Sequence, residues 1–225
     1  MIFPCIAAII GQQFKILASN LKNNIFYALL KCGIPRHVVN DFKNNFDRLE
    51  PNETIMSVIK RNQFRKANLI YLKKNIAHHQ ILLNYCDDLN RIIGFFLFVK
   101  IIAAFCNIIF IMFTLITSGA QTEIMSLCFY VFFASTELFV YTYGGQILIE
   151  KSEFLWDLYD SPWYLCEVKF QKLMLMVQMK VQRVVYMRAG GYFAMCAPMF
   201  ITFMKSLMSY IALLRELVVS DKSNS

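Results

Sequence analysis

The chain lacks the short motifs that mark the common enzyme families. It contains no GxSxG, no GxxxxGKS or GxxxxGKT, no HExxH and no glycine-rich turn between a strand and a helix. Hydrolase, nucleotide-binding and zinc peptidase chemistry are therefore not indicated. Its 7 cysteines include no CxxC pair and no Cys/His cluster at metal-ligand spacing, which argues against a disulfide framework or a zinc site. We expect no enzyme activity, no cofactor and no metal, and mostly buried, reduced thiols.

Charge is scarce as well. Charged residues make up 17% of the 225 residues and hydrophobic residues 57%, against about 25% and roughly 45–50% in an average soluble domain. The net charge is +8, from 23 Lys and Arg against 15 Asp and Glu. With a mean hydropathy of +0.46, this excess indicates the basic cytoplasmic loops of a membrane protein. We expect a lipid bilayer as partner and no nucleic acid.

Three long apolar stretches each contain one charged side chain. In chain order these side chains are Lys100, Glu137 and Lys205. About 20 apolar residues suffice for a helix to cross the hydrocarbon of a bilayer, so the stretches predict an all-α polytopic membrane protein. The stretches are residues 92–117, 124–149 and 190–214, and the last predicted helix continues to residue 217.

Lysine and arginine are unevenly distributed between the connecting segments. Residues 12–91 contain 13, residues 150–189 contain six, and the turn at 118–123 contains none. Because basic residues accumulate on the cytoplasmic side, the first two segments are predicted inside and the turn outside. The predicted order is the inner end of a truncated transmembrane helix (1–11), a cytoplasmic loop and helical extension (12–91), a transmembrane helix (92–117), a short extracellular turn (118–123), a transmembrane helix (124–149), a cytoplasmic loop and helix (150–189), a transmembrane helix (190–217) and an extracellular tail (218–225).

The cytoplasmic segments contain two predicted amphipathic helices, at residues 68–89 and 164–187, where apolar residues recur at helical spacing. Such faces need partners, which could be each other or neighbouring subunits. Residues 31–60, with glycine and proline among Asn and Asp, predict a loop instead. The apolar side of the second helix, and so the predicted subunit interface, includes Leu173, Met176, Val177 and Val181.

Ionised side chains inside a membrane persist only with a partner or a watery cavity, because each costs about 2.5–3.5 kcal/mol at a helix centre on insertion scales. Lys205 and Glu137 lie deep in their stretches, so we expect them to pair with each other or to face water. Lys100 lies nearer the inner end, where its side chain could reach the interface. The adjacent His78 and His79 point about 100° apart on a helix, which predicts a solvated face rather than a metal site.

Aromatic and sulfur-containing side chains are concentrated in the outer halves of the first two full stretches. Such surfaces suit a pocket for a small volatile ligand, and they suit packing or lipid contact equally well. The Tyr141 hydroxyl could orient a polar group on an otherwise apolar ligand. The predicted ligand-binding residues are Phe105, Phe129, Phe133 and Tyr141.

The order of several short motifs resembles the C-terminal half of the insect odorant receptor family. The basic helix carrying Ala77-His78-His79 and the opening QQFKIL resemble the segment between that family's fourth and fifth helices. The remaining matching positions are Leu138-Phe-Val-Tyr141-Thr-Tyr-Gly144, Ser152, Leu158-Tyr159, Trp163, Phe200, Lys205, Ser209-Tyr210 and Leu213-Leu214-Arg215.

This resemblance implies a seven-helix fold of which the chain holds the end of helix 4 through helix 7. It also implies a subunit that binds volatile odorants and gates a non-selective cation channel. The channel would be a hetero-tetramer with a shared odorant co-receptor, located in the dendritic membrane of olfactory sensory neurons. The 150–189 helix would form an anchor between subunits, and the last helix would line the pore. Leu213 and Leu217 align with the family's hydrophobic gate, and Glu216 would attract cations.

Other functions remain open from the residues alone. A gustatory-receptor-like channel would end in a TYxxxxxQF-like motif, whereas this chain has Ser209-Tyr210-Ile-Ala-Leu-Leu-Arg. A small multi-pass transporter or assembly protein is the second alternative, although transporters ordinarily show internal repeats or matching broken helices. A membrane enzyme is the third.

Overall fold

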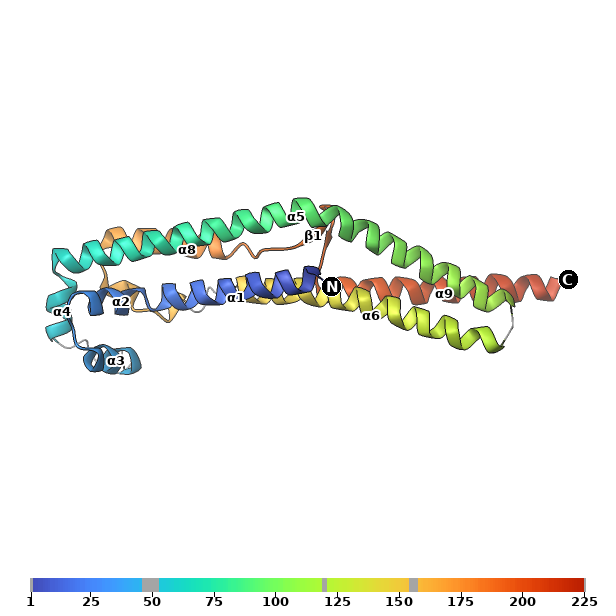
Figure 1. Cartoon of the computed structure of the whole chain (residues 1–225), viewed down its shortest axis with the longest axis horizontal. Helices are drawn as coiled ribbons and strands as arrows, with labels where there is room; N and C mark the ends of the chain where they lie inside the picture. Colours follow the sequence, from blue (N-terminus) through green and yellow to red (C-terminus); the bar gives the residue numbers. More distant parts are fainter. Residues whose placement is uncertain (1, 46–52, 119–120, 154–157, 225) are drawn as a thin grey trace. The chain divides into compact units, whose positions relative to one another are not determined.

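Among the residues that the structure, a computed structural model, describes, the regular elements are helices and one two-stranded hairpin (Figure 1). The description covers residues 2–45, 53–118, 121–153 and 158–224. The all-α fold class predicted from the sequence is confirmed. The elements are α1 (Ile2–Lys22), α2 (Asn24–Lys31), α3 (Arg36–Asn45), α4 (Glu53–Ile59), α5 (Asn62–Ser118), α6 (Gln121–Ser152), the 3-10 helix η1 (Trp163–Leu165), α8 (Val168–Val181), β1 (Arg188–Ala189), β2 (Phe193–Ala194) and α9 (Ala197–Asn224).

The chain divides into two compact units. Unit 1 contains residues 1–9, 86–149 and 186–225, and unit 2 contains residues 10–85 and 150–185. Helices α1, α5 and α6 contribute residues to both, so the division runs mostly through helices.

In unit 1, helices α5, α6 and α9 pack against one another through aromatic side chains. Phe105 of α5 meets Phe203 of α9 edge to face, with ring centroids 5.6 Å apart. Phe139 of α6 makes the same kind of contact with Phe200 of α9, at 5.5 Å. Edge-to-face pairs of this kind stabilise helix contacts beyond the burial of their area. Within the part of the chain that is described, the helix segment Asn62–Ile111 is long and apolar enough to cross a membrane.

The last helix begins later than the sequence predicts, because a β-hairpin occupies the expected first turns. Gly190 and Gly191 have φ values of 60° and 81°, which glycine adopts without strain and which a helix does not contain. The hairpin is held to α5 by the Gly190 N–H, which donates to the Gly94 carbonyl at 2.8 Å. Helix α9 starts at Ala197 instead, with Pro198 in its first turn, where a missing N–H costs nothing. It continues to Asn224, through the predicted tail.

The end of the same hairpin also lies very close to the backbone of α6, at Gly145. A Cβ added to Gly145 would lie 2.0 Å from the Met195 carbonyl oxygen, so only glycine permits this approach. Gln146, the next residue, accepts a hydrogen bond from the Ala197 N–H at 3.3 Å. The start of α9 is therefore fixed to α6 as well as to α5.

Unit 2 contains a buried cluster of asparagines. The Asn24 side chain of α2 donates to Oδ1 of Asn68 on α5 at 2.6 Å, and Asn75 donates back to Asn24 at 3.2 Å. Asn68 donates to the Cys166 sulfur at 3.3 Å. These hydrogen bonds compensate for burying amides, and they connect α2 and α5 to the turn before α8. Burial raises the pKa of Cys166 to about 12, so it stays a thiol at neutral pH.

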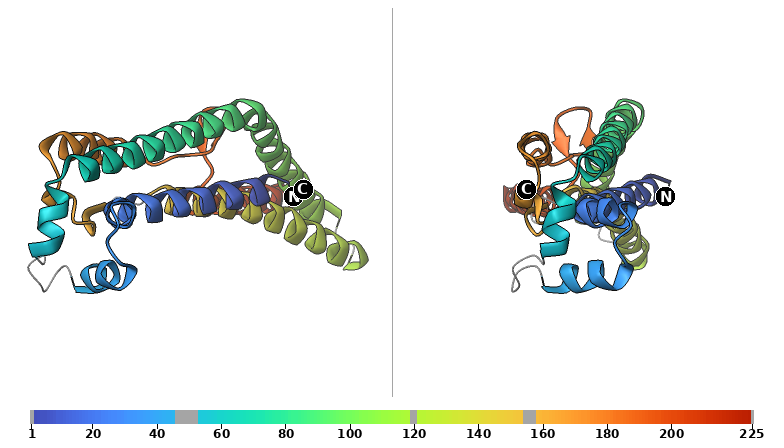
Figure 2. Two further views of the ribbon diagram at one scale, coloured as in Figure 1. Left: turned by 60° about the vertical axis from the view of Figure 1, so that its left-hand side comes forward. Right: turned by 90° about the vertical axis from the view of Figure 1, so that its left-hand side faces the viewer.

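The segment predicted as a loop at 31–60 contains two helices, α3 and α4. Figure 2 shows them as two separate short helices that run in different directions. Val39 and Phe42 of α3 are buried, as are Ile55 and Ile59 of α4, and Phe42 contacts Phe26 of α2 at 5.9 Å. These contacts outweigh the low helix propensity of the Asn and Asp residues between them. Residues 46–52, including the Asn52 of an Asn-Glu-Thr sequon, lie outside the described residues.

Helix α8 is shorter than predicted. It ends at Val181 rather than at Met187, because tertiary hydrogen bonds engage the following backbone. The Val185 N–H donates to the Ser152 hydroxyl at 3.2 Å, within unit 2. The Met187 carbonyl accepts from the Met195 N–H at 2.8 Å, within unit 1. Residues 68–89, by contrast, lie entirely within helix α5, so the helix predicted there is present.

Candidate functional site

An ion pair joins α5 to α6 in the middle of the predicted spans. The Lys100 ammonium donates to Oε1 of Glu137, and both side chains are about half exposed on the isolated chain. Pairing removes the net charge that an apolar environment penalises. The expected pairing of Glu137 with Lys205 is therefore wrong. Lys205 is exposed on α9, and it belongs to none of the ion pairs formed between described residues.

The ion pair lies beside hollows in the surface of unit 1. One hollow of about 340 Å³ is lined by both charged residues, by Ala104 and Ala134, and by Tyr130 and Phe133, among others. A second, of about 350 Å³, is lined by Glu137, Thr136, Phe133, Val140, Tyr141 and Pro4 of α1. Both fall in the size range of small-molecule sites. The arrangement therefore suits a small ligand with an apolar body and one polar group.

Two of the four predicted ligand-binding residues line these hollows. Phe133 borders both, and Tyr141 borders the second hollow, with its ring 6.1 Å from that of Phe3. Phe129 is exposed and borders neither. Phe105 contacts α9 through Phe203 instead. The spacing of aromatic residues along a helix cannot distinguish packing against a neighbouring helix from an open site.

Several residues around the ion pair were not predicted. The alanines at 103, 104 and 134 leave space for the first hollow because their side chains are too short to fill it. Asn107 supplies an amide to the same hollow. An intramembrane charge facing alanines on the next helix was the signal in the sequence that could have located this site.

The predicted subunit interface on α8 is only partly available. Val177 and Val181 are buried within unit 2, together with Phe170 and Met174, which follow at helical spacing along one face. These two valines are therefore corrected from interface residues to core residues. Leu173 is half-buried and Met176 is exposed. Leu175, Met176 and Met179 are exposed apolar side chains on one side of α8 and form the α8 outer face, and Val168 is exposed at the start of the helix.

The predicted gate residues lie on one continuous helix, α9. Leu213 and Glu216 are exposed on the isolated chain, and the Leu217 side chain lies outside the described part. Spacing of four residues places Leu213 and Leu217 on one face of that helix. Their role in a pore stays a prediction.

His79 is buried, which corrects the predicted solvated face. Its ring meets that of Phe14 of α1 edge to face at 6.3 Å. Burial lowers the pKa of His79, and the charges of Lys180 and His78 lower it further. The buried ring is therefore uncharged at neutral pH.

Comparison with known proteins decides which family the chain belongs to. Residues 5–208 match the family described as 7tm Odorant receptor. The chain belongs to the 7tm odorant receptor family. It is also similar to Odorant receptor 22c of Drosophila melanogaster, with 26% identity over 82% of this chain and 45% of that protein. Odorant receptor 10 of Aedes albopictus is 21% identical over 73% of this chain and 44% of its own length.

The chain spans about half the length of the curated relatives it matches. Putative odorant receptor 85d of Drosophila melanogaster, at 21% identity, is matched over 68% of this chain and 37% of that protein. Membership in this odorant receptor family supports the helical fold class and the resemblance stated above.

Proposed function

We propose that the receptor containing this chain binds volatile odorants and gates a non-selective cation channel. The observation that carries the proposal is the pair of hollows beside Lys100 and Glu137, in a chain of the odorant receptor family. The aromatic walls and the polar group match what small, mostly apolar ligands require. The seven-helix fold that the resemblance implies has further helices, and these would complete the enclosure of the hollows.

The channel is proposed to be a hetero-tetramer with a shared co-receptor, assembled through the α8 outer face. Met176 and Met179 are exposed on a helix whose opposite face is already packed. Methionine adapts to irregular partner surfaces, and apolar side chains on an exposed helix face favour contact with another protein. Of the interface predicted from the sequence, Met176 is kept, and the buried Val177 and Val181 are replaced by Leu175 and Met179.

The pore is proposed to run along the last helix of each subunit. Leu213 and Leu217 of four subunits would form two stacked rings that close by dewetting. Glu216, exposed beside them, would attract cations. The positive-inside distribution places residues 12–91 and 150–189 in the cytoplasm and the end of the chain outside, and the dendritic membrane of olfactory neurons is the proposed location.

The experiment is to express the gene's full reading frame in cells with an insect odorant co-receptor and to record currents during application of an odorant panel. We expect at least one odorant to evoke a cation current in cells that express both proteins, and none in cells that express either alone. A receptor that reaches the surface with its co-receptor and answers no odorant, or a current carried by anions, would contradict the proposal.

A further inference from the structure

The ion pair occupies the position where an odorant's polar group would bind. Glu137 lines both hollows, and Lys100 lines the first of them. Beside the pair, three alanines leave the first hollow open, and Phe133 and Tyr130 supply aromatic walls. The site is therefore amphipathic, with one end charged and the other apolar.

The hydrogen-bonding capacity of the pair is only partly used. A lysine ammonium has three donors, and Lys100 directs one at Oε1 of Glu137. The second carboxylate oxygen has no hydrogen-bond partner among the described side chains and backbone groups. A hydroxyl group can accept from the ammonium and donate to this oxygen at the same time, whereas a ketone can only accept and an alkane can do neither.

Charged ligands fit less well, because the pair is already neutral as a whole. An organic ammonium would have to displace Lys100 from Glu137, and a carboxylate would have to displace Glu137 from Lys100. Either exchange leaves one charge without its partner in an apolar environment, which is strongly unfavourable. A neutral ligand leaves the pair intact.

We propose that the hollow beside Lys100 and Glu137 binds neutral aliphatic alcohols, and that the ion pair is the specificity-determining element that selects the hydroxyl group. The inference rests on the proposed odorant-gated function and adds the ligand class. The alcohol donates to Glu137 and accepts from Lys100, while its carbon chain lies over Ala104 and Ala134 against Phe133.

The first test needs no variant. Cells that express the full receptor and its co-receptor receive 1-hexanol, 2-hexanone, hexane, hexylamine and hexanoate at matched free concentrations. We expect 1-hexanol to be the most potent, by about tenfold or more over 2-hexanone, because hydrogen bonds to charged groups are the stronger ones. A ketone or amine that equals or exceeds the alcohol would overturn the inference.

The second test removes the pair in one step, by Lys100→Met with Glu137→Leu, so that no unpaired charge remains. The potency of 1-hexanol relative to hexane should fall by about tenfold or more, while the hexane response and surface expression are retained. The matched control is Lys205→Met, which removes an exposed charge outside these hollows and should leave the ratio unchanged.

An unchanged ratio in the double variant would overturn the alcohol assignment, and the current evoked by other odorants would still support the proposed function. A wild-type receptor at the surface that answers no odorant would instead contradict the proposed function. If the double variant fails to reach the surface, the potency order of the wild-type series still decides between alcohol and ketone.

Discussion

Methionines on opposite faces of α8 offer a test that separates folding from assembly. Met174 is 1% exposed, whereas Met176 and Met179 on the same helix are 60% and 61% exposed. The same truncation, methionine to alanine, can therefore be compared at a buried position and at exposed positions of one helix. The buried position reports on the stability of unit 2, and the exposed positions report on contacts that the single chain does not make.

The expected magnitudes follow from these exposures. Met174→Ala should destabilise the fold by about 2–5 kcal/mol, the usual cost of removing a buried side chain. Met176→Ala and Met179→Ala should each change the single chain by less than about 0.5 kcal/mol. Full burial of a methionine contributes about 1.5–3 kcal/mol, so burying the exposed three-fifths of each would contribute about 1–2 kcal/mol to association.

The assay combines thermal unfolding of the purified receptor in detergent with co-purification on a tagged co-receptor. Met174→Ala should lower the unfolding midpoint by several degrees. The double variant Met176→Ala with Met179→Ala should unfold at the same temperature as wild type. It should lose most of the bound co-receptor, because the two methionines together contribute about 2–4 kcal/mol to association, which corresponds to a 30- to 1000-fold weaker complex. Full retention of the co-receptor by the double variant would refute the interface on the α8 outer face. Val177→Asp cannot serve as this test, because Val177 is buried in the single chain and the charge would disrupt the fold.

Four further predictions concern topology, ligand, pore and pH. Asn52 should carry no glycan, because the basic residues of 12–91 hold its segment inside; a glycosidase-sensitive mass shift would reverse the orientation. Tyr141 borders the second hollow and not the one assigned to alcohols, so Tyr141→Phe should weaken responses to ligands that bind a hydroxyl in the second hollow about three- to tenfold, the loss of one neutral hydrogen bond; equal shifts for every ligand would indicate altered gating. Leu217→Ser should leak current without odorant and Glu216→Gln should change cation permeability ratios, whereas unaltered resting current and selectivity would remove this helix end from the pore. Burial lowers the pKa of His79, so protonation favours the unfolded chain, and the stability contributed by the neutral ring should be lost as the pH falls below about 6.5. The unfolding midpoint of wild type should therefore fall between pH 7 and pH 5.5 by more than that of His79→Leu. The same change in midpoint in both proteins would contradict this.

The sequence predicted the helical class because hydrophobic length and periodicity depend on neighbouring residues alone. Residues 68–89 are helical for that reason. The prediction failed where long-range contacts decide the backbone. Gly190 and Gly191 interrupt an apolar stretch with a hairpin bonded to Gly94, and α3 is helical because Phe42 packs on Phe26.

The candidate site was predicted in its parts rather than in its arrangement. Lys100, Glu137, Phe133 and Tyr141 were each identified from residue type, but their pairing depends on the register of α5 against α6. That register is set by contacts between side chains distant in sequence. The alanines that leave the hollow open were missed, although alanines facing an intramembrane charge are a signal that the sequence contains. On α8 the sequence shows apolar residues on two faces, and only packing reveals which face is already covered.

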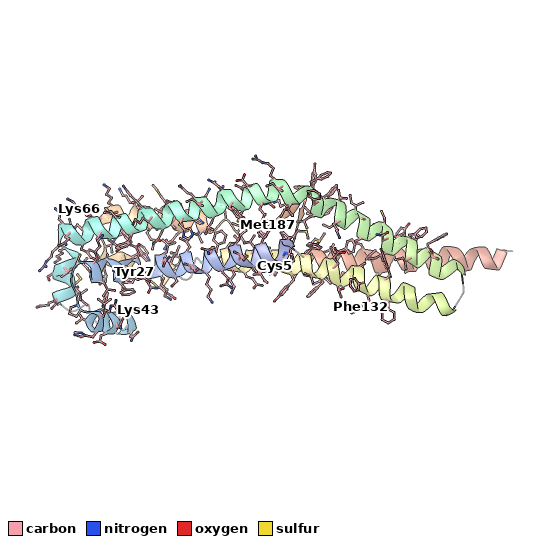
Figure 3. The ribbon with its side chains drawn as sticks, viewed as in Figure 1. Cys5, Tyr27, Lys43, Lys66, Phe132 and Met187 are labelled. Carbon is pink, nitrogen blue, oxygen red and sulfur yellow. The ribbon has the colours of Figure 1, made fainter. Side chains whose placement is uncertain are left out.

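The most direct measurement of the central claim is the odorant-evoked current after the first hollow has been filled. Ala134 borders that hollow, so Ala134→Phe should occupy the space and abolish the response while surface expression and co-receptor binding persist. Phe132 projects from the outer side of α6 (Figure 3) and borders none of the described hollows, so Phe132→Ala is the matched control and should respond like wild type. An undiminished odorant current in Ala134→Phe would contradict a ligand site beside Lys100 and Glu137.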